Sequence, residues 1–295
     1  MSIRRILQVA RFEWFDAVRS RRAIVVLVLY LAASLLSMNG AITALGKMES
    51  QLAEVLQLPA DGSRGVVSAT LWKSKRFQKM VRSALGDSLV YDDLGRRQPA
   101  DLLYAWFAFF YVPLLTVLVA GNRAADELHS GSVRYMIIRV TRIEWSLGKY
   151  IGISALLLVG LLFGSVAAWG TAAYRLFGAD ISALFPAMLV WGVKAWIYSF
   201  AWLGLALGIS HFVQSGAKAT ALGIAALVVW FAAPPLLERF AGEYPALTRF
   251  FPGGVEDALW RSSFEPIASA ALWLLALGIL YLSAGIAVFA GRDAR

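Results

Sequence analysis

Long stretches of apolar residues with very few charges alternate with short charged segments along the chain. A membrane-spanning helix needs about 20 mainly apolar residues, because the hydrocarbon core is about 30 Å thick and a helix rises about 1.5 Å per residue. The stretches that meet this requirement are residues 23–45, 102–121, 150–174, 186–210, 219–237 and 267–290. The pattern therefore predicts an all-α polytopic membrane protein with six transmembrane helices.

Residues 1–22 show a different pattern, in which apolar side chains recur at helical spacing. This apolar stripe consists of Ile6, Leu7, Ala10, Trp14, Ala17 and Val18. Arg4, Arg5 and Arg11 lie off the stripe. A basic amphipathic helix of this kind lies in the plane of the membrane interface instead of crossing it. We therefore expect an N-terminal amphipathic interfacial helix that runs directly into the first span.

Residues 46–101 separate the first two spans and are long enough for a small helical insertion. Residues 66–85 have the spacing of a basic amphipathic helix. Its basic residues are Lys73, Lys75, Arg76, Lys79 and Arg82. This basic face could contact anionic headgroups, an acidic partner protein or an anionic substrate. A charged face that is simply solvated is the plainer interpretation, and we favour it.

The overall composition excludes an ordinary soluble protein. Hydrophobic residues make up 59% of the chain and charged residues only 16%, whereas soluble chains have about 45–50% and about 25%. The mean hydropathy is +0.64. The net charge of +9 would suit a nucleic-acid partner, but the charges lie mainly between apolar stretches. We therefore interpret them as topology signals and expect a lipid bilayer, with no nucleic acid, as the surrounding partner.

The distribution of Lys and Arg predicts the orientation of the spans. Short loops on the cytoplasmic side are enriched in these residues, and they are frequent in residues 1–22 and 122–149 but rare in 175–185. With six spans, both termini, the loop 122–149 and the tail 291–295 then lie in the cytoplasm. The segments 46–101 and 238–266 lie outside; the first is basic, but long loops translocate largely regardless of charge. We expect a multi-pass protein of the cell (inner) membrane.

Motifs for chemistry on this chain are missing from the sequence. It has no Walker A pattern for ATP, no cysteine and two widely separated histidines. We therefore expect no catalytic residue, no metal site and no cofactor on this chain. Lys194 interrupts the fourth predicted span, and an ionisable residue in a span is a functional candidate by default. The simpler interpretation, which we favour, is that its flexible stem reaches the outer headgroups.

Glycine pairs with GxxxG spacing occur in the third and fourth predicted spans. Gly160 and Gly164 form one pair, and Gly204 and Gly208 form the other. Small residues at this spacing let two helix backbones approach closely. Packing within one chain is at least as good an interpretation as a dimer interface.

The predicted cytoplasmic loop at residues 124–152 is the most informative segment for function. Apolar residues Met136, Ile137 and Ile138 form a patch inside an otherwise charged loop. A solvated linker does not need such a patch, so we expect a short helix that docks onto another surface.

This loop resembles the ABC-2-type permease family, the membrane subunits of one large group of ABC transporters. Members typically have an acidic residue, Gly-Thr or Gly-Ser, an apolar run, an Arg-Pro-x-Ser-Arg turn and Gly-Lys at the start of the third span. Val140 stands where the family has proline, which leaves the geometry of the turn open. The resemblance assigns coupling to an ATPase to Glu127, Gly131, Arg134, Met136, Ile137, Ile138, Arg139, Arg142, Gly148 and Lys149.

The resemblance also implies the partners and the mechanism. Two copies of an ABC ATPase subunit, which hold the ATP and Mg, would pair with this chain and a second copy or a related permease. The favoured function is thus the permease subunit of an ATP-driven exporter. One alternative is a complex that transmits ATP-driven motion to an extracytoplasmic protein without transporting a substrate. A secondary transporter is a further alternative, although it would favour paired ionisable residues in mid-membrane and repeated halves. The sequence does not indicate the substrate.

Overall fold

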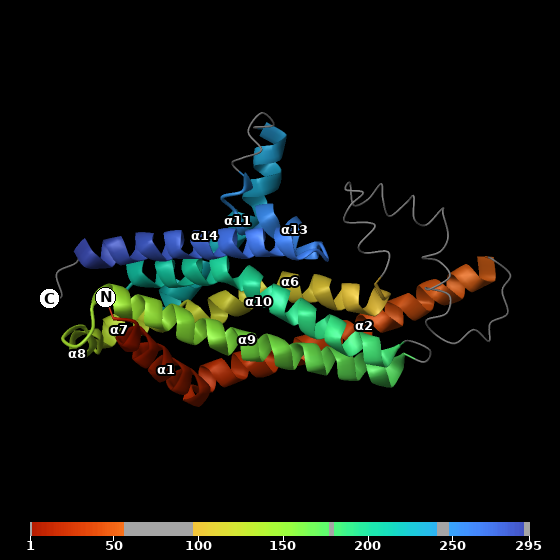
Figure 1. Ribbon diagram of the computed structural model, residues 1–295, viewed down its shortest axis with the longest axis horizontal. Helices are drawn as coiled ribbons and strands as arrows, with labels where there is room; N and C mark the ends of the chain where they lie inside the picture. The colour runs from red at the N-terminus through yellow and green to blue at the C-terminus, as the bar shows by residue number, and fades with distance from the viewer. Residues whose placement is uncertain (1, 56–96, 177–179, 241–247, 292–295) are drawn as a thin grey trace.

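The structure, a computed structural model, describes residues 2–55, 97–176, 180–240 and 248–291 (Figure 1). Six of the described helices are long and apolar enough to cross a membrane. They belong to α2 (Arg21–Val55), α6 (Pro99–Ala120), α9 (Arg142–Arg175), α10 (Ile181–Phe212), α11 (Gly216–Phe240) and α14 (Phe264–Gly291). This confirms the prediction of an all-α polytopic membrane protein with six spans.

Shorter helices lie at the two ends of the bundle. At one end, α1 (Ile3–Arg19), α7 (Arg123–Ser130) and α8 (Val133–Ile137) gather near the last turn of α14 (Figure 1). We call this the terminal end, because the first and last described helices meet there. The turn η1 (Pro252–Val255) and α13 (Glu256–Trp260) connect α11 to α14 away from the terminal end. Both predicted cytoplasmic segments with described structure, 1–22 and 122–149, are thus neighbours in space.

Helix α10 is the centre of the bundle and packs against α14, α6, α9 and α11. Its contact with α14 is a backbone-to-backbone approach. A Cβ atom added to Gly204 would lie 2.0 Å from the Gly278 carbonyl oxygen, and one added to Gly208 would lie 2.6 Å from the Tyr281 carbonyl oxygen. Glycine is therefore required for α10 to lie this close to α14. Both predicted glycine pairs serve packing within the chain, since Gly160 and Gly164 accommodate side chains of α2.

Helix α1 lies against α9 and is separated from α2 by Ser20, whose backbone is extended. The side that it buries consists of Ile6, Val9, Ala10, Glu13 and Ala17. Other large apolar residues stay exposed, namely Ile3, Leu7, Phe12, Phe15 and Val18. The stripe seen in the sequence is thus divided, with Leu7 and Val18 outside. Helix α1 therefore carries large apolar residues on both its buried and its exposed sides, which a single stripe does not describe.

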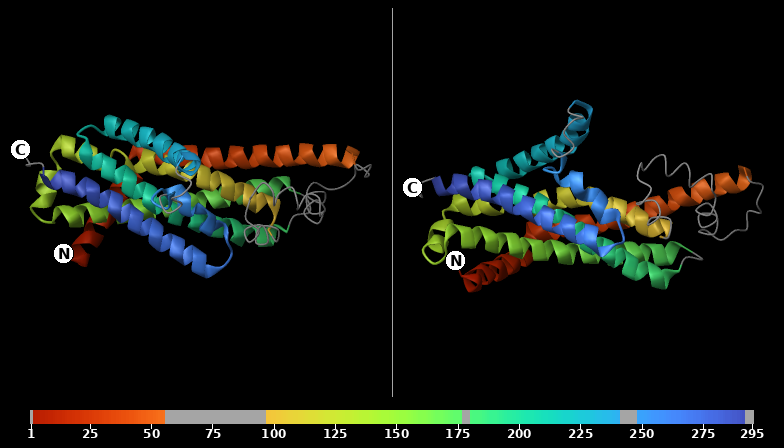
Figure 2. Two further views of the ribbon diagram at one scale, coloured as in Figure 1. Left: turned by 90° about the horizontal axis from the view of Figure 1, so that it is seen from above. Right: turned by 45° about the horizontal axis from the view of Figure 1, so that its top comes forward.

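Helix α2 continues to Val55 and projects beyond its neighbours at the end opposite to α1 (Figure 2). The predicted basic helix at 66–85 follows this projection in sequence. That helix, with Lys73, Lys75, Arg76, Lys79 and Arg82, lies outside the described residues.

Candidate functional site

The short helix α8 is held between two well-defined chain reversals. Gly131, which ends α7, has a φ of 71°. This left-handed backbone conformation is readily adopted by glycine and rarely by other residues. On the other side, Thr141 caps α9 by a capping box, in which its hydroxyl accepts from the Glu144 N–H and the Glu144 carboxylate accepts from the Thr141 N–H. The predicted coupling segment is therefore a helix with fixed ends.

Helix α8 has an inner face and an outer face. On the inner face, Val133 is buried in a cluster with Val9 of α1, Trp145 of α9 and Phe289 of α14. On the outer face, Tyr135 is 79% exposed and Ile138, just after the helix, is 81% exposed. Arg134 and Arg139 are exposed beside them. The outer face thus presents an apolar pair and two guanidinium groups.

The structure divides the apolar patch that was predicted to dock as a unit. Met136 packs on the inner cluster, together with Leu128 and Val140. Ile138 points outward, and Tyr135 takes the place beside it that the sequence interpretation had given to Met136. Successive residues of a helix are rotated about the axis by about 100°, so three consecutive side chains do not lie on one face. Ile137 belongs to α8, but its side chain is not described.

A buried cation, Lys149, joins the terminal-end helices. Its Nζ lies 2.6 Å from the Glu13 carboxylate of α1 and also donates to the Glu127 carboxylate of α7. The second Glu127 oxygen accepts from the Trp145 indole N–H at 3.2 Å. Lys149 is 1% exposed and Glu13 is 2% exposed. Charges buried to this extent need mutual partners, because their hydration is lost.

Arg123 extends this cluster to the outer side of α1. Its guanidinium donates to the Asp16 carboxylate at 2.7 Å and lies 3.7 Å from the free oxygen of Glu13. Glu13 thus forms ion pairs with a lysine of α9 and an arginine of α7. We call Glu13, Asp16, Arg123, Glu127 and Lys149 the ion cluster. It connects α1, α7 and α9.

The close seating of α1 on α9 depends on Gly148 and Gly152. A Cβ atom at Gly148 would lie 2.5 Å from the Val9 Cβ, and one at Gly152 would lie 2.6 Å from the Ala10 carbonyl oxygen. The N-terminus of α1 is also attached, because the Ser2 N–H donates to Glu144 at 2.6 Å. The predicted coupling residues Gly148 and Lys149 therefore contact this chain's own first helix.

Arg142 connects the start of α9 to the end of α14. Its guanidinium donates to the Phe289 and Ala290 carbonyl oxygens at 2.7 and 3.0 Å and lies over the Phe289 ring. A cation at a helix C-terminus satisfies carbonyls that have no partner within the helix and complements the helix dipole. Of the predicted coupling arginines, Arg142 thus has an internal role in the structure, whereas Arg134 and Arg139 lie on the outer face.

Helix α10 forms hydrogen bonds to the start of α7 and to the start of α9. The Ser210 hydroxyl accepts from the Ala124 and Ala125 N–H groups, and His211 pairs with the Ser146 hydroxyl at 2.9 Å. Sequence reasoning missed these residues and missed Glu13, Asp16 and Arg123. A signal existed for Glu13 alone: it continues the spacing of Ile6, Ala10 and Ala17 and so falls on the buried stripe.

Lys194 lies far from the terminal end. It is 3% exposed, its Nζ donates to the Arg261 carbonyl oxygen at 2.8 Å, and it lies 4.3 Å from the centre of the Trp191 ring. The amine therefore contacts the loop before α14 and an aromatic face, both within the chain. A backbone carbonyl and an aromatic ring are both favourable partners for a buried ammonium group.

Comparison with known protein families gives a match that includes the helices of this site. Residues 7–250 match a family described as ABC-2 family transporter protein. The match covers most of the chain, from α1 to the segment before η1, and includes the complete ion cluster. No curated protein matches this chain.

Proposed function

Because the chain belongs to the ABC-2 transporter family, and is a transmembrane permease subunit of an ABC transporter, we propose that it is an exporter subunit driven through the outer face of α8. On this proposal a separate ATPase subunit binds Tyr135, Ile138, Arg134 and Arg139. The supporting observation is the pair of large apolar side chains that are about 80% exposed on a helix with fixed ends. Polar and apolar groups of this kind suit a protein groove.

The inner contacts of α8 offer a route for its motion. A displacement of α8 acts on Val133 and Met136, which pack against Trp145 and Phe289. Those two residues belong to α9 and α14, both of which cross the membrane. The ion cluster carries the same displacement through Glu127 and Lys149 to α1. Closely packed interfaces respond to such a push by switching between discrete arrangements, because their packing does not deform continuously.

The partners on this proposal are those that the family resemblance implies. Two ATPase copies, holding ATP and Mg, bind the α8 helices of two permease chains, which are identical copies or related permeases. The terminal end then faces the cytoplasm of the cell, in agreement with the Lys and Arg bias of residues 1–22 and 122–149. ATP binding closes the ATPase dimer, the α8 helices move with it, and this motion biases the spans between two arrangements.

The outer face is tested with Ile138→Asp and Tyr135→Ala in the tagged chain, purified from native membranes. We expect the ATPase activity that co-purifies with the chain to fall about tenfold for Ile138→Asp. A tenfold weaker association corresponds to a loss of about 1.4 kcal/mol of binding free energy. Tyr174→Ala is the matched control, because Tyr174 is 82% exposed at the other end of α9. ATP hydrolysis that survives in both variants, with thermal unfolding unchanged, would contradict the proposal.

The projecting end of α2 supports an alternative to export, in which the chain transmits motion to an extracytoplasmic protein. A helix of 35 residues is longer than a bilayer needs, and its end reaches beyond the bundle (Figure 2). In reconstituted vesicles, ATP hydrolysis without movement of lipid, peptide or drug substrates, together with cross-linking of this end to a second protein, would favour transmission. Substrate movement without such a cross-link would favour export.

A further inference from the structure

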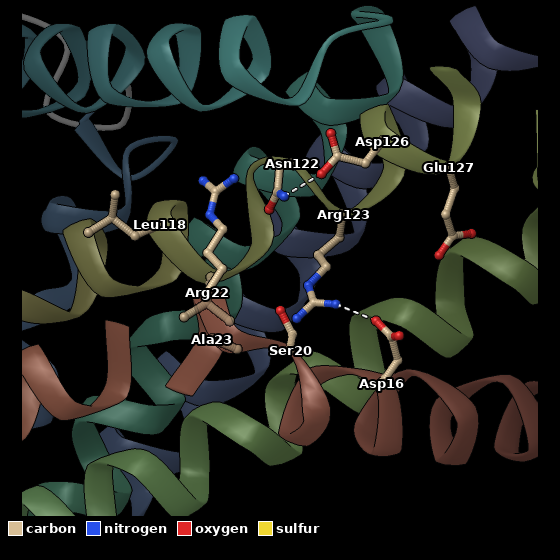
Figure 3. Close-up of a pocket in the computed structure, with 10 residues that line it drawn as sticks. Asp16, Ser20, Arg22, Ala23, Leu118, Asn122, Arg123, Asp126 and Glu127 are labelled. Carbon is tan, nitrogen blue, oxygen red and sulfur yellow. Dashed lines mark hydrogen bonds and ion pairs between the residues drawn. The ribbon is translucent and has the colours of Figure 1, made fainter. Parts of the chain in front are cut away.

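A cavity of about 410 Å³ lies at the elbow between α1 and α2 (Figure 3). Its walls come from α1, α2, α6 and α7, and Thr220 of α11 adjoins it through a hydrogen bond from Arg22 at 3.0 Å. Polar and apolar side chains share the lining: Leu118, Val119 and Ala23 form an apolar side. The cavity therefore combines a charged region with an apolar wall.

Most charges around the cavity already have a charged partner in the ion cluster. Arg123 is paired with Asp16, and Glu127 is paired with Lys149. Two further charges have neutral hydrogen-bond partners within the described structure. Arg22 donates to the Thr220 hydroxyl, and Asp126 accepts from the Asn122 amide. Figure 3 shows the Arg22 guanidinium and the Asp126 carboxylate on either side of Asn122.

The cavity lies at the ends of three membrane-spanning helices. Arg22 stands at the start of α2, Val119 in the last turn of α6, and Thr220 in the first turns of α11. The ends of membrane-spanning helices are where lipid headgroups lie, because the spans match the thickness of the hydrocarbon core. The apolar residues Leu118 and Val119 continue from the cavity along α6 into the span, in the direction that acyl chains take.

We propose that this cavity binds the headgroup of an aminophospholipid from that leaflet, with the phosphate on Arg22 and the ammonium on Asp126. Guanidinium groups bind phosphate oxygens by strong, directional hydrogen bonds. A primary ammonium donates to a carboxylate in the same way, whereas the methyl groups of choline do not. Phosphatidylglycerol offers no cation to Asp126. The charge pattern thus matches phosphoethanolamine among common headgroups.

The test uses the purified full chain in detergent and measures bound lipid by native mass spectrometry. Phosphatidylethanolamine, phosphatidylcholine and phosphatidylglycerol are titrated in turn. We expect phosphatidylethanolamine to bind about tenfold more tightly than the other two lipids, because its ammonium group makes one additional charge-assisted hydrogen bond. Arg22→Ala should lower this affinity about tenfold, and Arg22→Lys should retain part of it. Asp126→Asn should remove the preference for phosphatidylethanolamine and leave phosphatidylglycerol binding unchanged.

Matched controls separate this site from general lipid binding. Arg21→Ala removes the neighbouring exposed arginine, and Asp257→Asn removes an exposed acid at the other side of the bundle; neither residue lines the cavity. Equal binding of the three lipids, or equal losses in Arg21→Ala and Arg22→Ala, would overturn the proposal. Glycerophosphoethanolamine that competes as well as the lipid would assign the site to a soluble phosphate ester. Disulfide cross-linking of two Ser20→Cys chains would assign the cavity to a second copy, since the chain has no other cysteine.

Discussion

The Nζ atom of Lys149 lies 2.6 Å from a carboxylate oxygen of Glu13, although 136 positions separate the two residues in the chain. This ion pair joins the first helix of the protein to the start of its third span. Glu127 completes the arrangement from α7, the helix that precedes α8. The short helix α8, with its exposed outer face, is thereby connected to both α1 and the transmembrane helix α9.

Lys149→Met should destabilise the protein by about 3–5 kcal/mol, because it leaves Glu13 buried without its lysine. The measurement is thermal unfolding of the chain in detergent. Lys218→Met provides the control, as Lys218 is an exposed lysine on α11. The double variant Glu13→Leu with Lys149→Met should recover part of the loss, because apolar residues can replace a buried pair. A single variant that unfolds like the wild type would contradict the buried pair.

Gly148→Ala should lower the free energy of unfolding by about 1–3 kcal/mol, because the new methyl group overlaps Val9. Val9→Ala in the same chain should restore only the part of the loss that comes from the Val9 Cγ1 contact at 2.6 Å, because alanine keeps the Cβ atom at 2.5 Å. Gly170→Ala is a control on the same helix, since a Cβ atom there meets nothing within 4 Å. That control should unfold at the wild-type temperature or slightly above it. Equal effects at positions 148 and 170 would show that α1 is not seated on α9 as described.

Arg142→Ala should loosen the last turn of α14, because the Phe289 and Ala290 carbonyls lose their donor. Hydrogen exchange of the peptide that contains Phe289 reports this local opening. We expect exchange about tenfold faster there, the change that corresponds to about 1.4 kcal/mol, and little change in α10. Arg139→Ala should leave α14 unaffected, because Arg139 lies on the outer face of α8. Unchanged exchange near Phe289 in the Arg142 variant would refute this role.

Glu256→Gln should alter the pH dependence of stability. Burial in α13 raises the pKa of the Glu256 carboxyl above its usual range. The folded protein therefore binds this proton more tightly than the unfolded chain, and stability falls as pH rises from the usual pKa through the raised one. Glutamine removes that titration and keeps an acceptor for the Trp260 indole, which donates to Glu256 at 3.3 Å.

The check for Glu256 is a series of unfolding temperatures from acidic to neutral pH. The difference between Glu256→Gln and wild type should shift in favour of the variant as pH rises. Asp257→Asn should reduce the pH dependence only in part, because burial raises the pKa of Glu256 more than the neighbouring Asp257 charge does. A constant difference across the series would contradict a raised pKa at Glu256.

The family and the spans could be predicted from the chain because both depend on local pattern. Apolar stretches of sufficient length specify membrane helices wherever they occur, and the residues around Gly131, Arg142 and Gly148 carry the family resemblance. Hydropathy alone does not give the helix boundaries. Helix α9 begins at Arg142, inside the predicted loop, because Thr141 and Glu144 form a capping box ahead of the apolar stretch.

The roles of the polar residues in the candidate site were harder to predict. Lys149 and Arg142 look like topology signals in the sequence, since basic residues are common at the ends of spans. In the structure one is buried between two carboxylates, and the other binds the end of α14. Periodicity on α1 could have pointed to Glu13, but its partners on α7 and α9 are distant in the chain.

The sequence by itself determined that the chain is helical, crosses a membrane six times and belongs to a transporter family, because hydropathy and motif spacing act within short segments. Only the tertiary structure decided which side of α8 faces outward and which charges are already paired. Those properties depend on contacts between helices far apart in the chain. The same reason explains the charges of Arg22 and Asp126. Each is an ordinary surface residue in the sequence, and they share one cavity only after α2 has packed on α6 and α7 has packed on α10.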